Sequence, residues 1–257
     1  MRLALALILM ALVPQAQALQ CSAQSGPHTA ALVELYTSEG CDSCPPADRW
    51  LQGLGAQGFA PGRVVPLSLH VNYWDYIGWK DPYAQQRFSD RQRQLAQVLR
   101  ARVVYTPQVV LQGRDFRPWY AARAFEEAVA SINAQPPAAR IALSLAGGRA
   151  GTLLTEIRAE LLDAAQASDA ALYLASYENN LVSSVATGEN RGRTLYHDYV
   201  VFEWVGPISF TAGKIAETRA LPLLPKAVLA NSGVAAFVQN RRTGGVLQAL
   251  MLPACPG

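Results

Sequence analysis

The stretch AALVELYTSEGCDSCPPADRW, residues 30–50, decides the expected fold. Its first eight residues are apolar and rich in strand-favouring side chains, which predicts a buried strand. The next three, SEG, are typical of a turn. Pro45 and Pro46 then indicate the first turn of a helix, where proline is tolerated. The sequence therefore predicts a strand, a turn and a helix, with Cys41 at the start of the helix and the helix ending near Gly55.

Cys41 and Cys44 form a C-x-x-C pair, and its chemistry follows from its predicted place. Residues three apart share one face of a helix, so the two sulfurs can meet. The helix dipole and the free N–H groups favour the thiolate of Cys41, which attacks a partner disulfide, while Cys44 resolves the mixed disulfide. Asp42 disfavours a second negative charge beside it. We therefore expect a Cys41 thiol less acidic than that of a strongly oxidising C-P-H-C enzyme.

Further strands and helices alternate after this stretch. Strands are expected at 64–71 and 103–113, a polar helix at about 81–100 and a clear helix at about 120–134. Alternating strands and helices predict a partly parallel sheet covered by helices.

Thr106-Pro107 interrupts the second of these strands. Proline inside a strand normally argues against the strand, and a cis-proline at its end resolves the conflict. A C-x-x-C pair with such a proline resembles the thioredoxin-like superfamily. More closely, LYTSEGCDSCPPAD, HVNYWDYIGWKDPYA and VVYTPQVVLQG resemble a family of bacterial secreted thioredoxin-like proteins of unknown function, over most of the chain. The resemblance implies that Pro107 flanks the disulfide and that the Thr106 backbone docks an extended peptide.

Two features depart from a minimal thioredoxin. Cys41 and Pro107 lie 66 positions apart (107 − 41), and the extra length fits a helical insertion at about 75–101. The nearest candidate for a buried proton-shuttling acid is Glu34, one position further upstream than expected. Its side chain can face the other side of the strand, because facing alternates along a strand.

The segment HVNYWDYIGWKDP, residues 70–82, supplies further candidate site residues. Ligands bind at the C-terminal ends of strands in open α/β sheets. We therefore expect His70, Trp74 and Asp75 near Cys41, as a substrate-binding surface. The alternative is that the aromatic residues pack the insertion onto the domain.

After a linker at 135–137 the sequence pattern changes from alternating strands and helices to strands. Several strand-like segments follow, and the pair GVAAFVQN/GGVLQALML flanks a turn, which predicts a hairpin. The expected fold class is thus an α/β thioredoxin-like domain (27–135) with a helical insertion, followed by an antiparallel β-sandwich domain (138–257) of about seven strands. His197 and Asp198 are interpreted as structural residues of a hairpin in this second part.

The composition excludes some classes of protein, and the N-terminal segment and the cysteines indicate the compartment. A formal charge of +3 and 16% charged residues argue against disorder and against nucleic-acid binding. Residues 1–18 read as a cleaved bacterial signal peptide, so a periplasmic protein free of the membrane is expected. Disulfides persist there, and four cysteines allow three pairings. We expect Cys41–Cys44 from their spacing and Cys21–Cys255 as a staple between the two ends.

Three functions fit these residues. The first is a periplasmic thiol–disulfide oxidoreductase that acts on protein thiols or disulfides with a redox partner protein and needs no cofactor or metal. The second is a Cu(I)-handling module in which Cys41, Cys44 and His70 hold copper, since copper prefers soft sulfur; zinc fits poorly because a structural site takes four ligands. The third is a non-catalytic partner-binding protein with an inert Cys41–Cys44 disulfide.

Overall fold

The structure, a computed structural model, describes residues 20–148 and 151–255. The predicted signal peptide lies outside the described residues and stays a prediction. No helix in the described part of the chain is long and apolar enough to cross a membrane.

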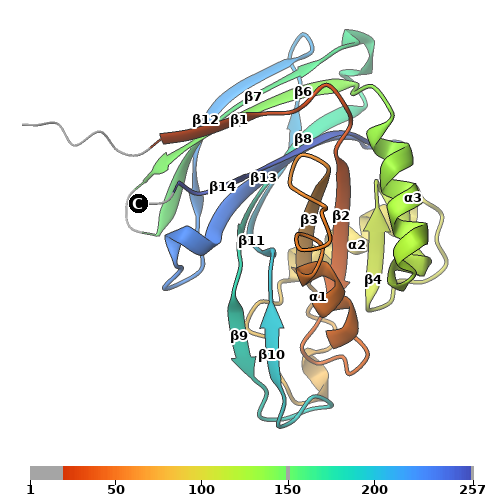
Figure 1. The fold of residues 1–257 in the computed structure, drawn as a ribbon, viewed down its shortest axis with the longest axis vertical. Helices are drawn as coiled ribbons and strands as arrows, with labels where there is room; N and C mark the ends of the chain where they lie inside the picture. Colours follow the sequence, from red (N-terminus) through yellow and green to blue (C-terminus); the bar gives the residue numbers. More distant parts are fainter. Residues whose placement is uncertain (1–19, 149–150, 256–257) are drawn as a thin grey trace, which may run out of the picture.

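One eight-stranded mixed sheet runs through the molecule (Figure 1). Its strand order is β14-β13-β8-β11-β3-β2-β4-β5. Their bounds are β2 Ala31–Thr37, β3 Val64–His70, β4 Gln108–Leu111, β5 Arg114–Asp115, β8 Ala170–Glu178, β11 Val200–Ser209, β13 Ser232–Asn240 and β14 Val246–Pro253. β2 and β3 are parallel, while β4 runs antiparallel to β2. The partly parallel sheet expected from the sequence is therefore present.

The expected division into two domains differs from what the sheet shows. β11 joins β3 in parallel at Val200 and Ser68, and β8 then pairs antiparallel with β11. Strands from both predicted domains therefore belong to one continuous sheet. A boundary near residue 137 separates segments of the chain without separating two sheets.

A second sheet covers the far half of the first (Figure 1). It is antiparallel, with the order β1-β6-β7-β12. Its strands are β1 Gln20–Gln24, β6 Ala139–Gly147, β7 Thr152–Leu161 and β12 Lys214–Pro222. Apolar side chains from this sheet pack against β8, β13 and β14 in one buried core. The expected sandwich packing is thus found, but one of its two sheets is the extension of the α/β sheet.

Helices cover both faces of the half that carries the C-x-x-C pair. They are α1 Pro45–Gln52, α2 Gln86–Val98 and α3 Ala122–Asn133. Val33 and Leu35 of β2 pack with α1 and α3, whereas Leu32 and Tyr36 face the core that includes α2. This alternation follows from the period of two along a strand, and it decides which buried polar residues meet.

A two-stranded hairpin of β9 (Leu181–Ser184) and β10 (Thr194–His197) extends beside α1 (Figure 1). β1, β5, β9 and β12 were not predicted, and residues 193–206 form two strands, β10 and β11, rather than one. Short 3₁₀ turns at Asp75–Ile77, Arg117–Tyr120, Ala164–Gln166 and Leu229–Asn231 complete the elements.

Candidate functional site

The C-x-x-C pair follows the C-terminal end of β2. The Cys41 N–H donates to the Ser38 carbonyl at 3.2 Å, which closes the turn that was expected there. Cys41 and Cys44 are joined in a disulfide, with their Cα atoms 5.5 Å apart. The helix begins at Pro45 and not at Cys41, so Cys41 lies one turn ahead of it. Prolines favour the first helical positions, and two of them fix the start here.

The disulfide is covered, which differs from the expected exposed redox pair. Cys41 and Cys44 are both 0% exposed, while Asp42 and Ser43 between them are exposed. The tip of the β9–β10 hairpin, residues 185–193, lies on this turn. Buried Asn190 donates from Nδ2 to the carbonyls of Glu39 at 2.8 Å and Cys41 at 2.9 Å. The Asp42 N–H donates to Glu189 Oε2 at 3.2 Å.

The Thr106–Pro107 peptide is cis and lies at the same end of the sheet. β2 and β4 pair Tyr36 with Gln108, which brings the preceding Pro107 level with the last residue of β2. Trp74 links this loop to the C-x-x-C turn. Its Nε1 donates to Thr106 Oγ1 at 2.7 Å, and its Cβ lies 3.0 Å from where a Cβ on Gly40 would stand. The structure therefore places Trp74 between the two loops, half-buried.

Asp75 is also half-buried beside Trp74, and it accepts from the Asp81 N–H at 3.3 Å. Burial raises the pKa of Asp75, and Asp81 adds to that rise, while the hydrogen bond from the Asp81 backbone opposes it.

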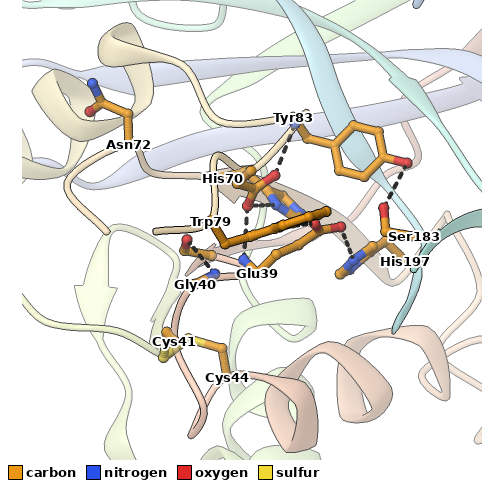
Figure 2. A network of polar contacts seen from close by, with 12 residues as sticks. Glu39, Gly40, Cys41, Cys44, His70, Asn72, Trp79, Tyr83, Ser183 and His197 are labelled. Carbon is orange, nitrogen blue, oxygen red and sulfur yellow. Dashed lines mark hydrogen bonds and ion pairs between the residues drawn. A yellow bond between two sulfur atoms is a disulfide. The ribbon is translucent and has the colours of Figure 1, made fainter. Parts of the chain in front are cut away.

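His70 lies at the C-terminal end of β3, opposite Thr37 of β2. It is fully buried, so it presents no surface to a substrate in this structure. Its Nδ1 lies 2.7 Å from Asp81 Oδ2, which also accepts from the Glu39 N–H at 2.8 Å (Figure 2). Burial alone would lower the pKa of His70, but Asp81 raises it above its ordinary value. Burial alone would raise the pKa of Asp81, but the charge and hydrogen bond of His70, together with the backbone N–H groups of Glu39 and Tyr83, hold it below its usual range.

Glu39 connects this pair to the hairpin. One carboxylate oxygen lies 3.1 Å from Nε2 of His197 at the end of β10, and the other accepts from Trp79 Nε1 at 2.7 Å (Figure 2). The rings of His70 and His197 stand edge to face, with their centroids 4.9 Å apart, and the Tyr83 ring contacts both. His197, interpreted from the sequence as structural, thus contacts the residue two positions before Cys41.

Asp48 completes the cluster from α1. It is buried, and it lies four residues after Cys44, which caps the N-terminus of this helix. Burial raises the pKa of Asp48, with His197 and His70 opposing the rise. Among the described residues, five buried side-chain polar atoms have no hydrogen-bond partner. Four of them belong to residues around this point: Thr37 Oγ1, Asp48 Oδ1, His70 Nε2 and His197 Nδ1.

Glu34, the predicted proton shuttle, is held elsewhere. Its position in β2 turns it toward the core that includes Leu32 and Tyr36, away from α1. Arg91 of α2 binds it with two hydrogen bonds, at 3.1 and 3.2 Å, and the Tyr36 hydroxyl donates to it. The structure does not bring Glu34 to the cysteines. The alternation of facing along the strand was the sequence signal for this outcome.

The copper interpretation rests on Cys41, Cys44 and His70 together. His70 is engaged by Asp81, and the two sulfurs are bonded to each other. In the described part of the chain, no group of three or more His, Cys, Asp or Glu is arranged to hold a metal ion.

The second disulfide joins Cys21 in β1 to Cys255 just after β14. It links two positions 234 residues apart at the edge of the four-stranded sheet. Both expected pairings are therefore formed in the structure, and the described residues contain no free cysteine.

Comparison with known sequences gives the family. The sequence profile of DUF1223, described as a protein of unknown function, matches residues 32–239. The chain belongs to this family. The match includes the C-x-x-C turn, the cis-proline loop and the β9–β10 hairpin. No curated protein matches this chain in sequence.

Two solved structures resemble this member of DUF1223. One is the crystal structure of protein AGR_C_4864 from Agrobacterium tumefaciens, with a TM-score of 0.60, 24% identity, and coverage of 91% of this chain and 98% of that one. The other is HBP35 of Porphyromonas gingivalis, with a TM-score of 0.65, 15% identity, and coverage of 90% of this chain and 76% of that one. At these identities the likeness shows the fold alone.

Proposed function

We propose that this DUF1223 protein is a periplasmic thiol–disulfide oxidoreductase of thioredoxin-like type that acts on protein cysteines. One observation carries the proposal: the Cys41–Cys44 disulfide stands directly before a helix and at the same sheet end as the cis-Pro107 loop. A thiolate ahead of a helix N-terminus is stabilised by the helix dipole. The signal-like residues 1–18 and the two disulfides support an oxidising compartment.

The proposed reaction balances with thiols alone. A partner thiolate attacks Cys41 Sγ, the bond to Cys44 breaks, and Cys44 leaves as a thiolate. The partner is then joined to Cys41 by a mixed disulfide. A second partner thiolate attacks the partner sulfur and releases Cys41, so the partner dithiol is oxidised and the C-x-x-C pair is reduced by two electrons. The same steps in reverse reduce a partner disulfide.

Access to Cys41 requires the hairpin tip to move. Asn190 and Glu189 occupy backbone groups of residues 39–42 that a docking peptide would otherwise reach. An extended partner would take these groups and the backbone of Thr106, by pairing with exposed main chain. We propose that the closed arrangement protects the disulfide until such a partner displaces the tip.

Trapping of mixed disulfides tests this function. The Cys44→Ala variant should accumulate covalent complexes between Cys41 and partner proteins, visible on non-reducing gels and lost on reduction. The double variant Cys41→Ala/Cys44→Ala should show none. Asn190→Ala, added to Cys44→Ala, should increase the yield, because it removes two hydrogen bonds that hold the tip. A Cys44→Ala protein that traps nothing, with or without Asn190, would contradict the proposal.

The burial of both cysteines favours a second candidate, a partner-binding protein in which this disulfide is structural. The two candidates differ in redox potential. A structural disulfide has a potential below about −300 mV, whereas a disulfide that exchanges with partners has a higher one. Equilibration of the protein against a dithiothreitol couple distinguishes them.

A further inference from the structure

The C-x-x-C reaction needs a proton at Cys44, and the structure offers a source other than Glu34. Cys44 is 0% exposed in the disulfide form, so its sulfur starts out of reach of water that could protonate it. Glu34 faces the opposite side of the sheet and is bound to Arg91. A buried thiolate with no proton donor is costly, because burial disfavours the charged form.

Asp48 lies one helical turn after Cys44, on the same face of α1. Positions i and i+4 of a helix lie on one face, with Cβ atoms roughly 5–6 Å apart. Side chains also lean toward the helix N-terminus, so Asp48 leans toward Cys44. The Asp48 N–H donates to the Cys44 carbonyl at 3.2 Å, which fixes this register.

The surroundings keep Asp48 available for proton transfer. Its Oδ1 makes no hydrogen bond of good geometry although it is buried, and the Thr37 hydroxyl, which contributes a weak hydrogen bond to Asp48, has no better partner itself. Burial raises its pKa, which favours the protonated acid. Buried polar atoms in folded proteins usually have at least one hydrogen-bond partner, so a poorly paired buried carboxyl group needs an explanation other than stability.

The charged and titratable groups that face Asp48 come from three sides. His70 lies at the end of β3, His197 at the end of β10, and Asp81 on the loop before α2. Glu39 follows β2 and binds His197, while Thr37 places its hydroxyl at the end of the same strand. A positive charge on either imidazole lowers the pKa of Asp48, so it stabilises the Asp48 carboxylate after the proton has left.

We infer that Asp48 gives a proton to the Cys44 thiolate when the Cys41–Cys44 disulfide opens, and takes it back when the disulfide re-forms. This inference rests on the proposed thiol–disulfide exchange. In the opening step a partner thiolate bonds to Cys41, Cys44 leaves with the electron pair, and the Asp48 proton moves to Cys44 Sγ. The Asp48 carboxylate remains beside His70 and His197. In the closing step the carboxylate removes the proton, and the Cys44 thiolate attacks the mixed disulfide.

The test measures the rate at which dithiothreitol opens the Cys41–Cys44 disulfide in the full mature chain, at a series of pH values. Asp48→Asn should slow opening by on the order of 10²-fold, the usual size of a general-acid contribution. It should also abolish the inflection in the pH–rate profile that comes from Asp48. The matched control is Asp42→Asn, which removes an exposed carboxylate next to Cys41 and should keep that inflection.

A structural role for Asp48 would give a different result. A rate lowered equally at every pH, with the inflection kept, would overturn the inference, as would an Asp48→Asn rate equal to that of the wild type. If Asp48→Asn does not fold, carboxyl NMR of the wild type decides. The Asp48 pKa should differ between the two redox states, because in the reduced protein Asp48 and Cys44 share one proton, and an equal pKa in both states would overturn the inference.

The test also separates this inference from the proposed function. Dithiothreitol needs no docking surface, so an Asp48 effect without any trapped partner would defeat the proposed function and leave the inference standing. Trapped partners without an Asp48 effect would do the reverse. A wild-type disulfide that dithiothreitol opens only after the protein unfolds would overturn both.

Discussion

Two buried acidic sites lie on opposite faces of β2, and they differ in how completely they are paired. Glu34 is bound by Arg91 through both carboxylate oxygens and by the Tyr36 hydroxyl. Asp48, on the side of α1, has a buried Oδ1 with no hydrogen bond of good geometry. A buried charge that is fully satisfied holds helix α2 to the sheet. A buried acid with a poorly paired oxygen, one turn from a disulfide, is available for chemistry.

The Glu34 site should give the largest effect on stability. Replacing Arg91 by methionine leaves a carboxylate buried without its partner, and such losses cost about 3–5 kcal/mol in the free energy of unfolding. Arg91 also lies over the rings of Tyr173, Trp204 and Phe237, which adds to the loss. Urea unfolding of Arg91→Met measures it.

The control is Arg93→Met, two residues along the same helix. Its ion pair with Asp90 is exposed, with side chains 45% and 51% accessible, so the change should cost at most about 1 kcal/mol. The double variant Glu34→Gln/Arg91→Met should recover part of the loss, because no unpaired charge remains. A loss from Arg91→Met no larger than that from Arg93→Met would show that the two faces do not differ as described.

The sequence predicted the site unevenly, and particular residues show why. The strand, the turn and the C-x-x-C pair are adjacent in the chain, so local patterns were sufficient for them. Facing along β2 follows from alternation, and it places Glu34 away from α1. Contacts such as that between Glu39 and His197, 158 residues apart, have no local signal. They depend on β11 pairing with β3, which places the β9–β10 hairpin beside α1.

The helix start shows a different limit. Cys41 was expected to open the helix, because the two prolines after Cys44 are compatible with several positions in a first turn. The structure begins the helix at Pro45, and Cys44 occupies the capping position. The contacts of Asn190 and Glu189 with residues 39–42 also have no local signal, because these two residues belong to the hairpin tip.

The His70–Asp81 pair on the α1 side should give an intermediate, pH-dependent effect. The raised pKa of His70 contributes stability that is present below its unfolded value of 6.5 and is lost as pH rises through the folded value. The lowered pKa of Asp81 contributes stability that is present above 3.8 and is lost as pH falls through the folded value. The pair therefore contributes fully between about pH 4 and 6.5.

Asp81→Asn should cost about 1.5–3 kcal/mol in that window, the usual loss of a hydrogen bond between charged groups. The difference from the wild type should shrink as pH rises above the window, because the wild-type imidazole then loses its charge. Urea unfolding at a series of pH values measures both curves. Two curves that run parallel from pH 4 to 8 would mean that the pair carries no charge-dependent stability.

Asp48→Asn should give the smallest effect on stability. It is therefore the strongest contrast with Arg91→Met. The amide has nearly the same shape, and it avoids the cost of burying a group that ionises, so the free energy of unfolding should change by less than about 1 kcal/mol and in either direction. The measurement is urea unfolding of the oxidised protein at pH 7, beside Arg91→Met. A loss as large as that of Arg91→Met would make Asp48 a second structural acid. A small change in stability, together with the slowed opening of the disulfide, would separate the acid that carries out chemistry from the acid that holds the fold.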